Sequence, residues 1–243
     1  MSPGPHLLGR VAPPDQRHLA LHPYAAGPPP ASVEVTITRP TLDTYDQGST
    51  PQCVGYAASK VMNHFNRYAF DAHWLYQQCK LVDGDPNGDG TNARAACDVL
   101  RAKGHWRKIN GKLVKAGPKL AHGISSNTWA STVDEIRSVF ARATPEPVLI
   151  GIDWLNAWFN PQLRGKDYWL QAPDTAGGVA GGHEIAVFAC SDQRQAFGLS
   201  NTWGASWPNP TKRDSLVWLP YSTMTWLFGH GADACVIQDL ASR

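Results

Sequence analysis

The chain changes character near its middle, and this change constrains its fold more than any other feature. From residue 45 to about residue 105, apolar residues recur at the three- and four-residue spacing of helices. Beyond about residue 142 they gather in short runs typical of strands, at 148–152, 184–189, 196–200, 216–219 and 234–237, and an earlier strand is expected at 32–38. A helical half followed by a β half predicts an α+β fold.

The first long helix is expected to begin near Cys53. Thr50 is a natural N-cap, and Pro51 suits the first helical position. Cys53 then lies in the first turn, where free backbone N–H groups and the helix dipole favour a thiolate, the reactive form of cysteine. A small apolar core residue is the equally common alternative for an unpaired cysteine.

Three further helices are expected, and a possible metal loop lies between two of them. The helices are 72–81, 92–103 with Thr91 as cap and Gly104 as stop, and a helix capped by residues 131–135 that runs to about residue 142. Residues 85–90 match the opening of an EF-hand loop. The closing position, which needs a glutamate, is Ala96, so a turn is favoured over a calcium site.

Residues 1–36 are expected to form an extended arm, because they contain eight of the 19 prolines. The 22 basic and 20 acidic residues are spread along the chain and give a net charge of only +2. This distribution argues against a nucleic-acid partner. No signal peptide or membrane-spanning run is visible. Five widely spaced cysteines indicate a reduced compartment, cytoplasmic or virion-associated, and we expect no cofactor and no metal.

Two later segments give Cys53 a specific context. His183 follows a glycine-rich loop, 177–182, and opens an apolar strand, and Asn201 begins the sequence Asn-Thr-Trp-Gly after the next strand. Together with Gln47-Gly48 six residues before the cysteine, these motifs resemble, in order and spacing, those of the papain-like cysteine peptidases of clan CA, most closely their short bacterial and phage forms. The resemblance covers about residues 37–243.

This resemblance implies a helical lobe of about residues 45–125, a β-barrel lobe of about residues 126–243 and a cleft between them for an extended peptide or protein substrate. It makes Cys53 the nucleophile, His183 the general acid and base, Asn201 the residue that orients His183, and Gln47 an oxyanion donor. It also implies that the substrate is contacted by Gly88, Asp89, Gly90, Trp203 and Trp207.

The sequence departs from the family pattern at two positions. Val54 replaces the aromatic residue that usually follows the cysteine, and Thr50 replaces a cysteine that secreted members use in a disulfide. The alternatives are a structural or interaction protein, for example a viral particle component, and an amidase of cell-wall peptides. Two roles are open for the arm: it is held by a larger assembly, or it lies as a strap across the cleft. Five aromatic residues line the cleft or, as we favour, fill the β lobe: Trp129, Trp154, Trp158, Tyr168 and Trp169.

Overall fold

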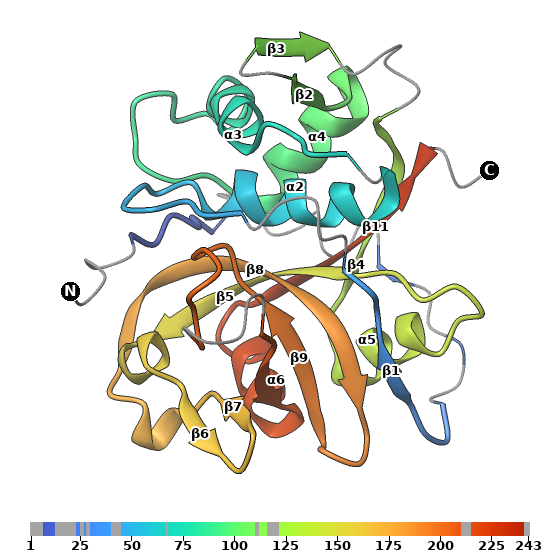
Figure 1. Ribbon diagram of the computed structural model, residues 1–243, viewed down its shortest axis with the longest axis vertical. Helices are drawn as coiled ribbons and strands as arrows, with labels where there is room; N and C mark the ends of the chain where they lie inside the picture. Colours follow the sequence, from blue (N-terminus) through green and yellow to red (C-terminus); the bar gives the residue numbers. More distant parts are fainter. Residues whose placement is uncertain are drawn as a thin grey trace.

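The computed structural model describes residues 7–12, 23, 24, 27, 30–39, 45–66, 68–109, 112–115, 122–209 and 215–240. Helices and a small hairpin make up its upper part in Figure 1: α2 (Cys53–Asn66), α3 (Ala72–Lys80), α4 (Ala93–Lys103), β2 (Trp106–Ile109) and β3 (Lys112–Lys115). No helix in the described ranges is both long and apolar enough to cross a membrane.

A large sheet makes up most of the lower part. Its strands are β1 (Glu34–Thr36), β4 (Ile124–Ala130), β5 (Val148–Leu155), β6 (Gln162–Arg164), β7 (Asp167–Trp169), β8 (Val179–Ser191), β9 (Ala196–Ser200), β10 (Val217–Pro220) and β11 (Asp233–Asp239). The order is β4-β11-β5-β8-β9-β10-β7-β6, with β1 added beside β8 and only β10 and β7 parallel. The α+β class is confirmed. The predicted barrel is not, because no pairing in the described residues joins β4 to β6 and the sheet is open.

Four shorter helical segments accompany the sheet: α5 (Val133–Phe140), α6 (Tyr221–Phe228) and the 3-10 turns η1 (Asn156–Phe159) and η2 (Pro173–Thr175). α5 begins with the predicted cap, a capping box in which Thr132 and Glu135 satisfy each other's backbone N–H groups. α4 is capped one residue later than predicted, by Asn92, whose side chain accepts from the N–H of Ala95. Gly104 ends α4 with a φ of 70°, as a C-terminal glycine allows.

α2 begins at Cys53, and Thr50 does not act as its cap. The Thr50 hydroxyl donates instead to the backbone oxygen of Gln47, at 2.6 Å, and so closes the loop that precedes the helix. The buried face of α2 packs against β8 and β5. Cys53 is thereby fixed between the helices and the sheet.

The glycine-rich stretch before His183 is partly strand rather than loop, because β8 already begins at Val179. A Cβ atom on Gly182 would lie 2.2 Å from the backbone oxygen of Arg10. Glycine is therefore needed where the start of the chain lies against this strand.

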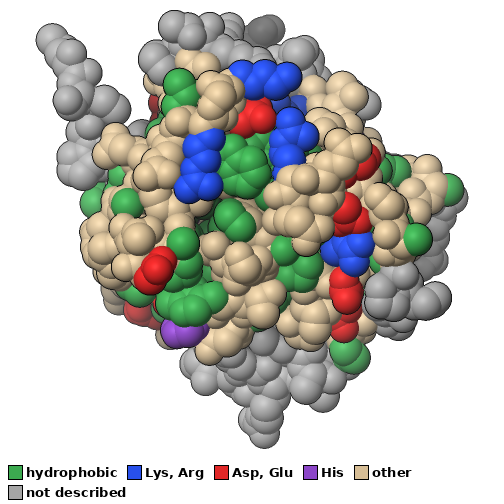
Figure 2. Space-filling model, turned by 90° about the horizontal axis from the view of Figure 1, so that it is seen from below, with side chains coloured by type: hydrophobic (Ala, Val, Ile, Leu, Met, Phe, Trp, Pro, Cys, Tyr) green, Lys and Arg blue, Asp and Glu red, His purple; other side chains and the backbone are tan. Residues whose placement is uncertain are grey.

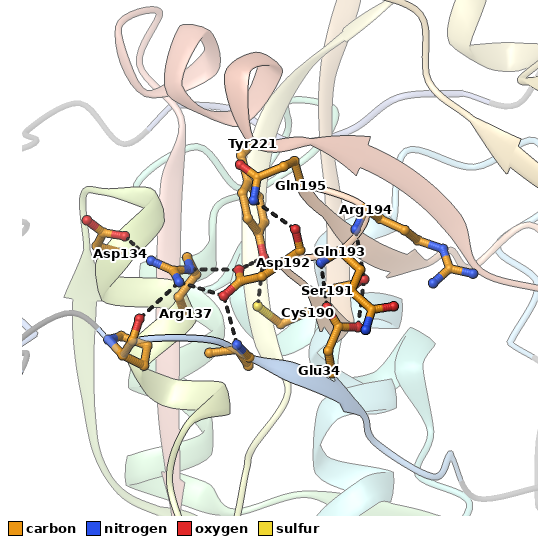
Figure 3. A network of polar contacts seen from close by, with 12 residues as sticks. Glu34, Asp134, Arg137, Cys190, Ser191, Asp192, Gln193, Arg194, Gln195 and Tyr221 are labelled. Atoms are coloured by element: carbon orange, nitrogen blue, oxygen red, sulfur yellow. Dashed lines mark hydrogen bonds and ion pairs between the residues drawn. The ribbon is translucent and has the colours of Figure 1, made fainter.

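A polar network fixes the far end of β8 (Figure 3). Asp192 accepts hydrogen bonds from Arg137 of α5, from the hydroxyl of Tyr221 of α6 and from the N–H of Val33 just before β1. One carboxylate thus joins two helices and the edge of the sheet. Burial alone would raise the pKa of Asp192, but these donors outweigh it and the pKa is lowered.

Figure 2 views the molecule from below and shows Lys and Arg side chains beside apolar ones, with acidic groups close by. Two cation–aromatic pairs involve β6, β7, β10 and the turn between β8 and β9. Arg164 lies 5.8 Å from the ring centre of Trp169, and Arg194 lies 4.6 Å from that of Trp218. Charges of both signs mix on this face.

Candidate active site

His183 and Asn201 are joined by a hydrogen bond across neighbouring strands. The His183 Nε2 atom lies 2.8 Å from Asn201 Oδ1, which also accepts from the backbone N–H of Thr202 at 2.8 Å. Because a carbonyl oxygen only accepts, Nε2 must carry the proton in this bond. The ring is therefore held with Nδ1 as the nitrogen turned away from Asn201.

The loop around Asn201 is tied to the helical part of the molecule. The ammonium group of Lys60, buried on α2, donates to the Asn201 backbone oxygen at 2.7 Å. Thr202 accepts the N–H of Gln47 with its backbone oxygen and donates its hydroxyl to the Gln47 side-chain oxygen, both at 2.9 Å. These bonds connect Gln47 to the residue next to Asn201, so both residues belong to one hydrogen-bonded cluster.

Aromatic rings enclose the His183 imidazole. The ring centres of Trp154 and Trp203 each lie 4.9 Å from that of His183, and both tryptophans are buried. Trp207 packs on Trp203 at 5.1 Å. Such rings exclude water from the His183–Asn201 hydrogen bond, which strengthens it. Trp154 thus adjoins the site, while Trp129 and Trp158 are buried as expected of core residues.

Cys53 lies against β8 at the residue that follows His183, because the backbone N–H of Glu184 points at its sulfur. The N–H groups of Gly9 and Val54 do the same, and all three lower the pKa of the thiol. Burial is the larger effect, and the charge of Glu184 adds to it, so the pKa of Cys53 is raised to about 12. The thiol is neutral in this arrangement, although the helix start alone predicted a thiolate.

Residues 7–12 lie in the space between the helices and the sheet, and they cover Cys53 (dark blue in Figure 1). Thr91 donates to Gly9 O and accepts from the N–H of Val11, at 2.9 and 2.8 Å, and the N–H of Arg10 donates to Gly182 O at 3.0 Å. The segment is therefore bound through its backbone to both walls. We call it the arm segment.

The side-chain amide of Gln47 already holds a peptide oxygen. Its Nε2 donates to Leu7 O of the arm segment and to Thr50 O, each at 3.0 Å. Close to this point, a Cβ atom on Gly9 would lie 2.1 Å from Pro51 O, so the arm segment can approach the start of α2 only with glycine there. A peptide carbonyl thus fits on Gln47 beside Cys53.

Gly88, Asp89 and Gly90 form the loop that was expected to contact the substrate, and Gly90 lies against the arm segment. A Cβ atom on Gly90 would lie 2.3 Å from Gly9 O, so Gly90 lies directly against the arm segment. Gly88 packs on the carboxylate of Asp85 in its own loop, and Asp89 is exposed. Within the described ranges, no cluster of three or more His, Cys, Asp or Glu residues is placed to hold a metal ion.

Comparison with solved structures identifies the fold. The chain is similar to xylellain, a cysteine protease from Xylella fastidiosa, with a TM-score of 0.65 and 17% identity over 96% of this chain and 91% of that one. It is similar to digestive procathepsin L 3 of the Tenebrio molitor larval midgut, with a TM-score of 0.67, 14% identity and coverages of 95% and 75%.

A third similar structure is proCathepsin B S9 from Trypanosoma congolense, with a TM-score of 0.64, 12% identity and coverages of 96% and 86%. The chain therefore has the papain-like fold. No family model matches the sequence, and no curated protein is significantly similar to it.

Proposed function

We propose that the protein is a papain-like cysteine peptidase that hydrolyses peptide bonds through a thioester on Cys53. The observation that carries this proposal is the arm segment itself. It is an extended peptide bound through its backbone to Thr91 and Gly182, beside a cysteine, a histidine and a side-chain amide. A cleft that binds one extended peptide in this way is suited to bind others.

In the proposed reaction, His183 takes the proton of the Cys53 thiol at Nδ1, and the sulfur attacks the scissile carbonyl carbon. The imidazolium then donates that proton to the leaving amine as the carbon–nitrogen bond breaks. Water hydrolyses the thioester and returns Cys53 and His183 to their initial state. Asn201 keeps the proton of Nε2 in a hydrogen bond throughout, which supports its role as a positioning residue.

Gln47 supplies the oxyanion donor in this proposal. Its amide binds Leu7 O of the arm segment, and a substrate carbonyl that replaces Leu7 O would receive the same N–H as its charge develops. Thr202 holds the other end of the amide, so the donor stays aimed into the cleft.

The arm segment would act as a strap that must leave before substrate enters. In its presence Cys53 is fully buried and its pKa is raised, so the proposed nucleophile is protonated. Two of the similar structures are named as proenzymes, procathepsin L 3 and proCathepsin B S9. The same closed cleft also favours the alternative of a structural protein that kept the fold, so the test must open it.

Gly9→Ala in the full chain is the opening variant, because its methyl group would clash with Pro51 O. We expect this variant to cleave denatured casein, with new N-termini found by mass spectrometry, and expect Cys53→Ala in the same background to cleave nothing. Purified peptidoglycan is digested in parallel to test for an amidase. No cleavage of either substrate by a folded Gly9→Ala variant whose Cys53 alkylates readily would leave the structural protein as the better explanation.

A further inference from the structure

The side chain of Arg10 leaves the arm segment and enters a buried acidic pocket next to Cys53. Its Nη2 atom donates to Asp233 Oδ2 at 2.6 Å and to Gly231 O at 3.0 Å. The side chains of Arg10 and Asp233 are only 5% and 4% exposed. A guanidinium group seated this deeply needs a site shaped and charged for it.

Glycine at position 151 of β5 makes room for that site. A Cβ atom there would lie 2.6 Å from Arg10 Nε, 2.8 Å from Asp233 Oδ1 and 3.0 Å from Glu184 Oε2. The guanidinium and two carboxylates therefore converge over Gly151, and any larger residue would fill the space. Asp153, on the same strand, adds a further negative charge that acts on Arg10.

Glu184 retains unused capacity to accept hydrogen bonds in this pocket. It is fully buried, and neither of its carboxylate oxygens has a hydrogen-bond partner among the described residues. Burial and then the charge of Asp233 raise the pKa of Glu184 well above its usual range, while Arg10 opposes them. The pKa of Arg10 is raised although its burial would lower it, because Asp233 and Glu184 outweigh burial. The pocket therefore favours a cation.

From these contacts we infer that the pocket formed by Gly151, Glu184, Gly231 and Asp233 selects arginine in the peptide substrate, and that Arg10 of the arm segment occupies the place of that arginine. The inference rests on the proposed peptidase function. Gly9 faces the Cys53 sulfur and Arg10 is the next residue, so the selected arginine lies within two residues of the scissile bond. Asp233 is the main specificity residue, since among the residues that the structure describes it forms the ion pair with the guanidinium.

Binding is measured first, without any need for catalysis. The full chain carries Gly9→Ala and Arg10→Ala to open the cleft and vacate the pocket, and Cys53→Ala to prevent turnover. The probes are peptides with the sequence of residues 7–12, with either arginine or its neutral analogue citrulline at the position of Arg10. We expect the arginine peptide to bind at least tenfold more tightly by calorimetry.

Asp233→Asn in the same background is expected to remove this preference, and Glu184→Gln to reduce it less. Asp167→Asn is the matched control, because Asp167, on β7 and outside the pocket, pairs with Arg194 of the turn between β8 and β9. Equal affinity for both peptides would overturn the inference. This comparison uses one protein and two peptides, so it decides the question even if Asp233→Asn fails to fold, which circular dichroism would reveal.

Cleavage of a peptide library by the Gly9→Ala, Arg10→Ala variant with Cys53 intact separates the two proposals. Arginine enriched at one position within two residues of the cut supports both. Binding preference without any cleavage keeps the pocket and removes the peptidase. Cleavage with no enrichment of arginine and no binding preference keeps the peptidase and removes the pocket.

Discussion

At the scale of single residues, the site depends on the imidazole of His183 being held in one tautomer and one orientation. Asn201 Oδ1 fixes the proton on Nε2, and Trp154 and Trp203 enclose the ring. In the proposed reaction, Nδ1 faces Cys53 only while this hydrogen bond is intact. We therefore expect Asn201 to act through His183 and not through contact with the substrate.

Asn201→Ala should lower kcat by about 100-fold in the Gly9→Ala background. General acid–base catalysis contributes a rate factor of about this size, and it depends on a correctly placed imidazole. KM should change little, since substrate binding does not involve Asn201. Steady-state kinetics on a fluorogenic peptide measures both constants.

The matched control is Asn127→Ala, which changes the same residue type on the edge strand β4 and should leave kcat unaltered. If Asn201→Ala changes KM but leaves kcat at its original value, the positioning role of Asn201 is contradicted.

Family motifs mark Cys53, His183, Asn201 and Gln47 locally, so the sequence alone could propose these residues. In the structure His183 bonds to Asn201, Gln47 bonds to the adjacent Thr202, and Cys53 meets the N–H of Glu184. The acidic pocket was missed. Arg10 and Asp233 are 223 residues apart, and Glu184 sits inside an apolar run that only indicates a strand. Nothing in such a run distinguishes a solvent-facing carboxylate from one aimed into a pocket, so only the fold reveals it.

At the scale of elements, the core strands were predictable and their ends were not. The run 184–189 indicated a strand, but β8 extends from Val179 to Ser191. Its first part includes Gly181 and Gly182, and glycine has low strand propensity, but this part forms because β5 pairs with it. Its last part is held by the Asp192 network, whose members come from distant segments.

Asp192→Asn should lower the free energy of unfolding by about 2 kcal/mol at pH 7, because the variant weakens partly buried hydrogen bonds to a charged group. The folded-state pKa of Asp192 is lowered, so its stabilisation is present above the unfolded-state pKa, about 3.9, and is lost as pH falls through the folded-state value. Urea unfolding at pH 7 and at pH 3 should therefore show a smaller difference at pH 3.

Asp98→Asn is the matched control for this measurement. Asp98 pairs with Arg101 on the surface of α4, where its side chain is 48% exposed, and its loss should cost less than about 0.5 kcal/mol. An undiminished effect of Asp192→Asn at pH 3 would show that packing, and not charge, accounts for it.

At the scale of the whole molecule, the start of the chain contacts both parts of the fold. The arm segment lies between the helices and the sheet, the N–H of Tyr24 bonds to the Trp129 backbone oxygen of β4, and Glu34–Thr36 pairs with β8 as strand β1. Three separate stretches are therefore attached to the fold at different places. We therefore expect the arm segment to leave Cys53 without release of the other two.

This independence leads to a prediction about the reactivity of Cys53. The wild-type chain should resist iodoacetamide at pH 7, because the arm segment buries the thiol and its pKa is about 12. Gly9→Ala should alkylate at Cys53 at least tenfold faster, since the added methyl group would displace the arm segment from Pro51. Peptide mapping distinguishes Cys53 from the other cysteines.

Gly27→Ala provides the matched control, because it makes the same substitution where a Cβ atom meets nothing within 4 Å, and it should react as slowly as the wild type. A synthetic peptide of residues 7–12 added to Gly9→Ala should slow alkylation again, whereas the citrulline form of that peptide should protect less, because it lacks the charge that Asp233 binds. Slow labelling of a folded Gly9→Ala variant, unchanged from the wild type, would mean that the core and not the arm segment shields Cys53.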